Sequence, residues 1–412
     1  MKQLHTNPFG KGWIQAIIFA ALLLLVHVSR AQEGGQGNTT IFGGGQMTFF
    51  GNYNFNTGGS GAQPGVILTE RAAGNFGILN FSGADLVATN ASDAGYVDGY
   101  VRKYGTGQFI FPVGDNAHLG QFAASADGTM GAYFYANPAT AVTTNLFTGG
   151  NYPALPTGGP FPTGMTTRGP GIKAVSSVEY WDIDGANATP ITLTWDAGSN
   201  VTTLTGGTLP RLTIVGWNGT RWVRIPSTVD ATSVLGGAST LTAGSITTNA
   251  AIVPNTYTAY ALAGMGPDLT PRIAVIPAAV HGTQVLEVVL SAIEVGGVVP
   301  TDGTPITVRI QKNPLLSNFV WNPAQATAPA NGNISVQNSI WTATQDASYY
   351  IFTTTTVIPA NSQRRLAFYL TLTPGTSEGA FSLPVSIPAG AGGGEVNLLN
   401  NQDAEQIQFF AN

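Results

Sequence analysis

The sequence contains no cysteine among its 412 residues. Disulfide bonds, thiol nucleophiles, thiolate metal sites and a lipid-bearing cysteine behind a leader peptide are therefore all excluded. Charge is scarce too, because only 9% of the residues are Asp, Glu, Lys or Arg, against roughly a quarter in an average soluble domain. The fold must consequently be stabilised mainly by burial of hydrophobic cores.

Clusters of basic residues are missing as well. The formal net charge is −5, and the longest basic runs are the pairs Arg102-Lys103 and Arg364-Arg365. Recognition of nucleic acids needs clustered Lys and Arg side chains. A nucleic-acid partner is therefore excluded.

Motifs of catalytic chemistry are also absent. Beyond residue 31 the chain has two histidines, His118 and His281, which lie far apart and outside any metal-ligand spacing such as H-E-x-x-H. Neither a G-x-S-x-G nucleophile elbow nor a phosphate-binding P-loop occurs. Two carboxylates facing one cleft, as in glycosidases, are not excluded by a sequence. The sequence predicts a protein that is not an enzyme, with a polysaccharide hydrolase as the less favoured alternative.

Turn-forming and hydrophobic residues are abundant instead. The chain has 53 glycines and 25 prolines without a G-X-Y period, which predicts many tight turns and excludes collagen. Hydrophobic residues make up 43% and aromatic residues 10%, too many for a disordered chain. The length allows two or three domains with substantial cores.

The N-terminus has the features of a secretory leader. Lys2 and Lys11 precede an apolar run from Ala16 to Val26, and Ser29-Arg30-Ala31 follows with small residues at the −3 and −1 positions. The run is too short to span about 30 Å of hydrocarbon as a helix, so a cleaved signal peptide is favoured over a membrane anchor. We predict that residues 1–31 are the signal peptide. The mature protein is then exported, extracellular or on the outer cell surface, with no membrane span.

Strand periodicity organises the remaining sequence. In Tyr96–Gly114, tyrosines alternate with valines, a glycine turn follows, and phenylalanines occupy one face of a returning strand, which predicts a half-buried hairpin. Residues 32–150 are predicted to form a β domain rich in glycine and aromatic residues. From Gln32 to about Phe81, short aromatic strand pieces separated by glycines suit a sheet or a short solenoid. A disordered start to this region is the alternative for its first residues.

Two further blocks of strands follow. Five prolines among glycines predict a surface linker over 151–171. Residues 172–265 predict a β-sandwich, in which Asn218-Gly219 supplies the two central positions of a type I′ hairpin turn. Residues 266–412 predict a second, immunoglobulin-like β-sandwich. The predicted fold class is all-β, with a Gly-rich N-terminal β region followed by two sandwiches.

Several of these segments resemble known surface proteins. Tyr96–Asp115, Glu179–Ile183 and Ile214–Gly219 resemble a recurrent module of large surface and secreted proteins from gliding-type Gram-negative bacteria. Pro267–Asn412 is similar to bacterial adhesin-type immunoglobulin-like repeats. The resemblance implies a modular architecture at the cell surface and defines no activity. Members often end in a sorting domain of the type IX secretion system; none is recognised after the Gln406–Phe410 strand, which leaves the anchoring route open.

One acidic segment has the spacing of a calcium loop. Asp182, Asp184 and Asn187 supply oxygen ligands of the kind that Ca²⁺ prefers. The bidentate acid that closes an EF-hand loop is missing, so a strand end followed by an Asx turn is the favoured interpretation. Asp93, Asp98 and the Asp115-Asn116 pair form a similar group. Calcium is the only cofactor that the sequence suggests.

Exposed aromatic side chains would indicate a glycan-binding module. The candidates are Trp181, Trp195, Trp217 and Trp222, but most of them continue apolar strand faces, which favours a place in the core. We therefore expect a structural or adhesive protein, with glycan binding as the alternative. Its partner is expected to be an extracellular polysaccharide or a matrix or cell-surface component; self-association is left open.

The leader gives a direct prediction. Signal peptidase should cleave the bond between Ala31 and Gln32, because the small residues follow the apolar run at the required spacing. Intact-mass and N-terminal peptide measurements on the exported protein should then find Gln32 as the first residue. An exported protein that retains Met1–Ala31 would show that the segment is an anchor.

Overall fold

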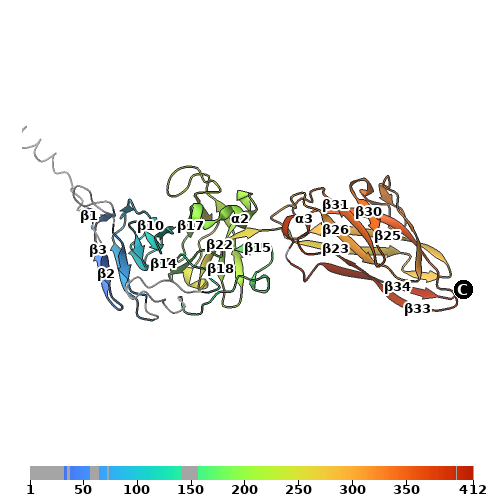
Figure 1. Ribbon diagram of the computed structural model, residues 1–412, viewed down its shortest axis with the longest axis horizontal. Helices are drawn as coiled ribbons and strands as arrows, with labels where there is room; N and C mark the ends of the chain where they lie inside the picture. The colour runs from blue at the N-terminus through green and yellow to red at the C-terminus, as the bar shows by residue number, and fades with distance from the viewer. Residues whose placement is uncertain are drawn as a thin grey trace, which may run out of the picture.

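A computed structural model describes residues 32–34, 38–55, 65–71, 74–140, 156–395 and 397–411. The predicted signal peptide lies outside these residues. Figure 1 shows the parts of the chain following one another along one long axis, with the C-terminus at the far end.

The helices are short: α2 Val201–Thr205, α3 Ala391–Gly394, and the 3-10 helices Met165–Thr167, Ala197–Ser199, Leu209–Arg211, Pro254–Thr256 and Asn338–Ile340. No helix of the described residues is long and apolar enough to cross a membrane. The all-β prediction is confirmed.

The first nine strands form a short parallel solenoid. Each turn of the chain adds one strand to each of three sheets, so that β1-β4-β7, β2-β5-β8 and β3-β6-β9 pair in parallel. The bounds are β1 Gln32–Gly34, β2 Thr39–Ile41, β3 Gln46–Phe49, β4 Asn52–Asn54, β5 Ile67–Thr69, β6 Ile78–Ser82, β7 Ala88–Thr89, β8 Val97–Asp98 and β9 Tyr100–Tyr104. Of the two arrangements predicted for this region, the solenoid is the one present.

Edge-to-face and tilted aromatic contacts, together with one glycine, hold the solenoid turns together. Phe49 from the first turn lies 5.5 Å, ring centre to ring centre, from Phe81 of the second, and Phe81 lies 4.9 Å from Phe109 beyond the third. Gly99 joins β8 to β9 with φ +127°, and a Cβ there would lie 1.9 Å from the Thr69 hydroxyl. Only glycine permits this close approach between successive turns.

The third solenoid sheet continues into a sandwich. Strand β9 pairs antiparallel with β14, which pairs with β16, so one sheet runs β19-β18-β22-β16-β14-β9-β6-β3, with β15 also on β22. A five-stranded sheet, β10-β13-β17-β21-β20, forms the other layer, while β11 and β12 extend the second solenoid sheet. The bounds are β10 Phe109–Phe111, β11 Val113–Asp115, β12 His118–Leu119, β13 Phe122–Ala124, β14 Met130–Phe134, β15 Ile172–Val175, β16 Tyr180–Asp184, β17 Thr192–Trp195, β18 Leu212–Trp217, β19 Trp222–Ile225, β20 Ser227–Val229, β21 Gly244–Thr248 and β22 Tyr260–Met265.

The nine-stranded sheet contains strands from both sides of the predicted linker, residues 151–171. All five residues of β14, before residues 151–171, pair with β16, after them. One core cluster extends from Ile41 in the solenoid to Leu262 in β22. Within the linker Phe161 is fully buried and packs against Trp222. The stretches 32–150 and 172–265 therefore share one sheet and one core, and we call residues 32–265 the N-terminal unit.

Residues 269–411 form a separate β-sandwich, the C-terminal sandwich. Its sheets are β23-β25-β32-β27 and β24-β34-β33-β26-β31-β30, with a small β28-β29 ladder. The alternating apolar residues of 286–290, 306–310 and 366–372 fill its core, as their periodicity predicts. The bounds are β23 Leu269–Ile276, β24 Ala279–His281, β25 Gln284–Glu294, β26 Ile306–Gln311, β27 Leu316–Val320, β28 Thr327–Ala328, β29 Ile334–Ser335, β30 Thr342–Gln345, β31 Tyr349–Thr354, β32 Gln363–Leu372, β33 Gly379–Ser386 and β34 Gln402–Phe410.

The predicted hairpin at Asn218-Gly219 is present, but its turn differs. Trp217 pairs with Trp222, which leaves a four-residue loop. The Asn218 side-chain oxygen accepts hydrogen bonds from the backbone N–H groups of Thr220 and Arg221, at 3.1 and 3.0 Å. Gly219 has φ +96°, whereas Asn218 is not among the residues with positive φ. A type I′ turn needs positive φ at both positions, so that assignment is wrong, and an Asx turn takes its place.

Substitution of Gly219 tests this loop. We expect Gly219→Val to lower the free energy of unfolding of the N-terminal unit by about 1–3 kcal/mol, because a β-branched residue is strained at positive φ. Gly164→Val is the matched control, since Gly164 has φ −67° and open space around its Cβ position. Thermal and urea unfolding should shift the N-terminal transition and leave that of the C-terminal sandwich in place. Equal shifts of both transitions would mean that the chain unfolds as one cooperative unit.

Candidate functional site

The three predicted calcium ligands do not converge. Asp182 is buried on β16, and its Oδ2 accepts a hydrogen bond from the Tyr100 hydroxyl at 2.8 Å. Asp184 lies on the same face of the strand, and burial together with the Asp184 charge raises the pKa of Asp182 well above its ordinary value. Asn187 is exposed, and its amide donates to the Asp127 carbonyl at 3.0 Å. Among the described residues, no group of three His, Cys, Asp or Glu side chains is placed to hold a metal; calcium binding stays a prediction.

The second acidic group is brought together by an arginine that the sequence did not reveal. Arg71 is fully buried, and its Nη2 lies 2.5 Å from Asp98 Oδ1 and 3.8 Å from Asp115 Oδ1. The guanidinium also stacks over Phe134, 4.7 Å from the ring centre. Asp93 lies apart and accepts from the Leu119 backbone. One signal was available: Glu70 and Arg71 are the first charged residues after Glu33.

Burial also raises the pKa of Glu179 and of Asp115. Burial raises the pKa of Glu179 to about 7, and the Tyr133 hydroxyl donates to this carboxyl at 2.8 Å. Burial raises the pKa of Asp115 to about 6, although Arg71 opposes the shift. These groups lie inside the core and line neither of the cavities described next. Their chemistry therefore concerns stability.

The four candidate tryptophans are core residues, as the sequence favours. Their exposed fractions are 6% or less. The indole N–H groups of Trp181, Trp195 and Trp222 donate to the carbonyl groups of Gly120, Thr240 and Pro162. None of the four presents a ring to a sugar.

A hollow of the described surface lies at the junction between the two units. A cavity of about 530 Å³ is bordered by Met165, Arg168 and Arg221 of the N-terminal unit and by Leu398 and Leu399 of the C-terminal sandwich. We call it the junction groove. Met165 is 50% exposed, Leu398 46% and Leu399 99%. Large apolar side chains left in water beside arginines are typical of a binding surface.

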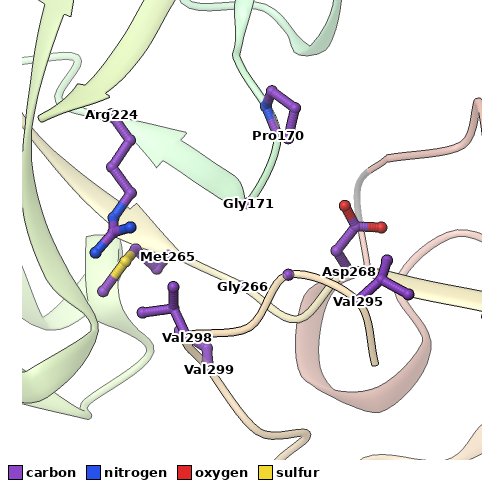
Figure 2. A pocket seen from close by; sticks show the side chains of 10 residues that line it. Pro170, Gly171, Arg224, Met265, Gly266, Asp268, Val295, Val298 and Val299 are labelled. Atoms are coloured by element: carbon purple, nitrogen blue, oxygen red, sulfur yellow. The ribbon is translucent and has the colours of Figure 1, made fainter. Parts of the chain in front are cut away.

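A smaller cavity of about 160 Å³ adjoins the groove, sharing Pro170 and Gly171 with it. Figure 2 shows Arg224 and Met265 entering this cavity from the N-terminal unit, facing the loop that carries Val298 and Val299. We call it the valine cavity. Both units contribute to its wall, so it exists only while they keep their present orientation.

Polar contacts hold that orientation. Arg211 Nη1 lies 3.4 Å from Asp302 Oδ2, and Lys173 Nζ donates to the Gly393 carbonyl at 2.9 Å. Gly266 allows close backbone approach, because a Cβ there would lie 2.8 Å from the Gly394 carbonyl oxygen. The junction is thus a packed seam with defined partners on both sides.

Comparisons with known proteins identify no family. No family model matches the chain, and no curated protein matches it either. Among solved structures it is similar to a CARDB domain from Pyrococcus furiosus in complex with di-metal ions, with 19% identity over 35% of this chain and 88% of that chain, at a TM-score of 0.22. It is also similar to the N-terminal domain of a Streptococcus gordonii adhesin, with 12% identity over 74% of this chain and 79% of that chain, at a TM-score of 0.26.

A third similar structure is a modular three-domain backbone pilin of Streptococcus pyogenes, with 11% identity over 69% of this chain and 65% of that chain, at a TM-score of 0.24. At identities of 11–19% and TM-scores of 0.22–0.26, these similarities carry no argument about function. The function must be inferred from the chain's own residues.

The buried carboxyl groups predict an unusual pH dependence. Glu179 has an ordinary pKa of 4.5 and a pKa of about 7 in the fold, so between these values the folded state binds more protons than the unfolded chain. The N-terminal unit should therefore lose stability as the pH rises through this window, by about 3 kcal/mol for this group. Asp115 acts in the same direction.

Thermal unfolding as a function of pH checks this. The N-terminal transition should move to higher temperature between about pH 8 and pH 5, and Glu179→Gln should flatten most of that slope. The C-terminal sandwich provides the internal comparison, because Glu179 and Asp115 both lie in the N-terminal unit. An N-terminal transition that is independent of pH, or that falls on acidification, would contradict the assignment.

Proposed function

We propose that this protein is an exported structural or adhesive element of the cell exterior, without enzymatic activity, and that the junction groove is its adhesive surface. One observation carries the proposal. The groove is bordered by three exposed apolar side chains, those of Leu399, Leu398 and Met165, and by two arginines. Contact surfaces of proteins are enriched in Met and Arg and depleted in Lys, Glu and Asp. Among the described residues, no Lys, Glu or Asp lines this groove.

The extended build of the molecule supports a structural role. The solenoid, the first sandwich and the C-terminal sandwich follow one another along the long axis in Figure 1. The ion pair Arg211–Asp302 and the Lys173 contact fix the seam between the last two. A fixed rod separates its two ends and presents its groove at a constant place, which suits a spacer or an adhesin.

The distribution of acids supports a function without catalysis. Hydrolysis of a glycoside needs two carboxyl groups facing one cleft. The buried acids Asp182, Asp98 and Glu179 each accept a hydrogen bond from a buried side chain. In the cavities described above, Asp268 is the one carboxylate of the walls.

Binding of the mature chain, residues 32–412, to an array of extracellular polysaccharides and matrix proteins tests the proposal. Leu399→Ser should weaken capture at least about tenfold, because a fully exposed apolar anchor is what a partner would bury. Leu235→Ser is the matched control, since Leu235 is 48% exposed on a loop outside the groove. Equal loss from both variants, or none from Leu399→Ser, would remove the groove from the adhesive role.

A parallel screen for turnover of polysaccharides, esters and peptides tests the absence of catalysis. We expect no turnover by the wild-type chain. Turnover that disappears in Asp182→Asn, with both unfolding transitions preserved, would make the protein a hydrolase and overturn the proposal.

A further inference from the structure

Arg224 is a cation without a protein partner. It lies on β19, the edge strand of the nine-stranded sheet, and its guanidinium enters the valine cavity (Figure 2). Its Nε is buried and makes no hydrogen bond, and no carboxylate of the described residues lies within ion-pair distance of it. Burial lowers the pKa of Arg224, and no neighbouring acid opposes that shift.

The other arginines of the N-terminal unit that are withdrawn from water have partners. Arg71 lies between two carboxylates, and Arg211 pairs with Asp302. Arg168 donates to the carbonyl groups of Thr163 and Lys173. Arg224 is the exception among them. The Arg224 Nε–H is withdrawn from water and has no acceptor, and burying a donor without an acceptor is unfavourable. A bound anion would supply that acceptor.

The acid in the same cavity does not neutralise it. The two carboxylate oxygens of Asp268 accept hydrogen bonds from the side-chain amides of Asn397 and Asn400, at 3.0 and 2.7 Å. Figure 2 shows these oxygens pointing away from the Arg224 guanidinium. The charge of Asp268 is therefore directed to the 397–400 loop, and the interior of the cavity keeps a single uncompensated cation.

The remaining wall is aliphatic. Met265, Val298 and Val299 face the space beside the guanidinium, and three glycines leave the backbone free of side chains there. Pockets for drug-sized ligands measure roughly 300–1,000 Å³, so a cavity of about 160 Å³ suits a ligand of a few heavy atoms. Guanidinium groups bind carboxylates through two parallel hydrogen bonds.

We infer that the valine cavity is a binding site for a small aliphatic carboxylate. The Arg224 guanidinium holds the carboxylate, and Met265 and the valines pack against the short hydrocarbon tail. Since the cation belongs to the N-terminal unit and the valines to the C-terminal sandwich, a bound acid bridges the seam. The site is independent of adhesion through the neighbouring groove.

Titration calorimetry with sodium butyrate tests the inference on the mature chain, against sodium chloride at equal ionic strength. Saturable binding of butyrate is expected, stronger than that of acetate because the longer tail reaches the valines. Arg224→Gln should weaken it at least about tenfold, the usual effect of losing a charged hydrogen-bond partner. Arg272→Gln makes the same change of charge at an exposed position on β23 and should leave binding unchanged.

Three results would overturn the inference. Butyrate that binds no better than chloride would show that water alone solvates Arg224. Equal binding to Arg224→Gln, in a variant whose unfolding transitions are intact, would place the acid elsewhere. Inorganic phosphate that binds more tightly than butyrate would show an anion site in which the aliphatic wall has no part. The adhesion assay is separate, so failure of either proposal leaves the other standing.

Discussion

The ion pair between Arg71 and Asp98 is the contact on which the N-terminal unit depends. Arg71 follows β5, Asp98 lies in β8 and Asp115 in β11, so three successive segments of one sheet meet at one guanidinium. Although burial alone would lower it, the charges of the two acids raise the pKa of Arg71 above its ordinary value. Removing one partner of a buried pair typically costs about 3–5 kcal/mol, because the other charge is left uncompensated.

The same contact explains how a solenoid and a sandwich become one body. Phe134, over which the guanidinium lies, belongs to β14, the strand that carries the solenoid sheet into the sandwich. A parallel stack of short strands has weak register of its own, since glycine-rich strands slip easily. The Arg71 guanidinium can contact Asp98, Asp115 and the Phe134 ring together in only one register of the strands that carry these residues. The nine-stranded sheet can then extend across the boundary without a break.

Local periodicity predicted the strands and their buried faces, because these depend on residues close together in the sequence. Alternation in Ile306–Gln311 and Gln363–Leu372 identified strands and their buried faces, and the same reasoning placed the four tryptophans in the core. Arg71 was missed because its acids lie 27 and 44 positions away, a distance over which no spacing rule operates. The prolines of 151–171 indicate a surface connection, whereas Phe161 packs against Trp222 in the sheet. Local composition does not reveal this contact, because its two residues lie far apart in the sequence.

The junction shows where this architecture leaves room for function. Inside each unit, aromatic and aliphatic side chains fill the core, and the buried Arg71 is paired with Asp98. Between the units two surfaces meet, and they are in contact where Gly266 approaches Gly394, where Arg211 pairs with Asp302 and where Lys173 donates to Gly393. Beside these contacts two cavities remain at the seam, where the Arg224 Nε has no hydrogen-bond acceptor and Leu399 is exposed. Contacts that fix the orientation of the two units, such as the ion pair between Arg211 and Asp302, keep the junction groove and the valine cavity open. Both proposed binding sites therefore lie where the packing between the two units is incomplete, close to the ion pair between Arg211 and Asp302.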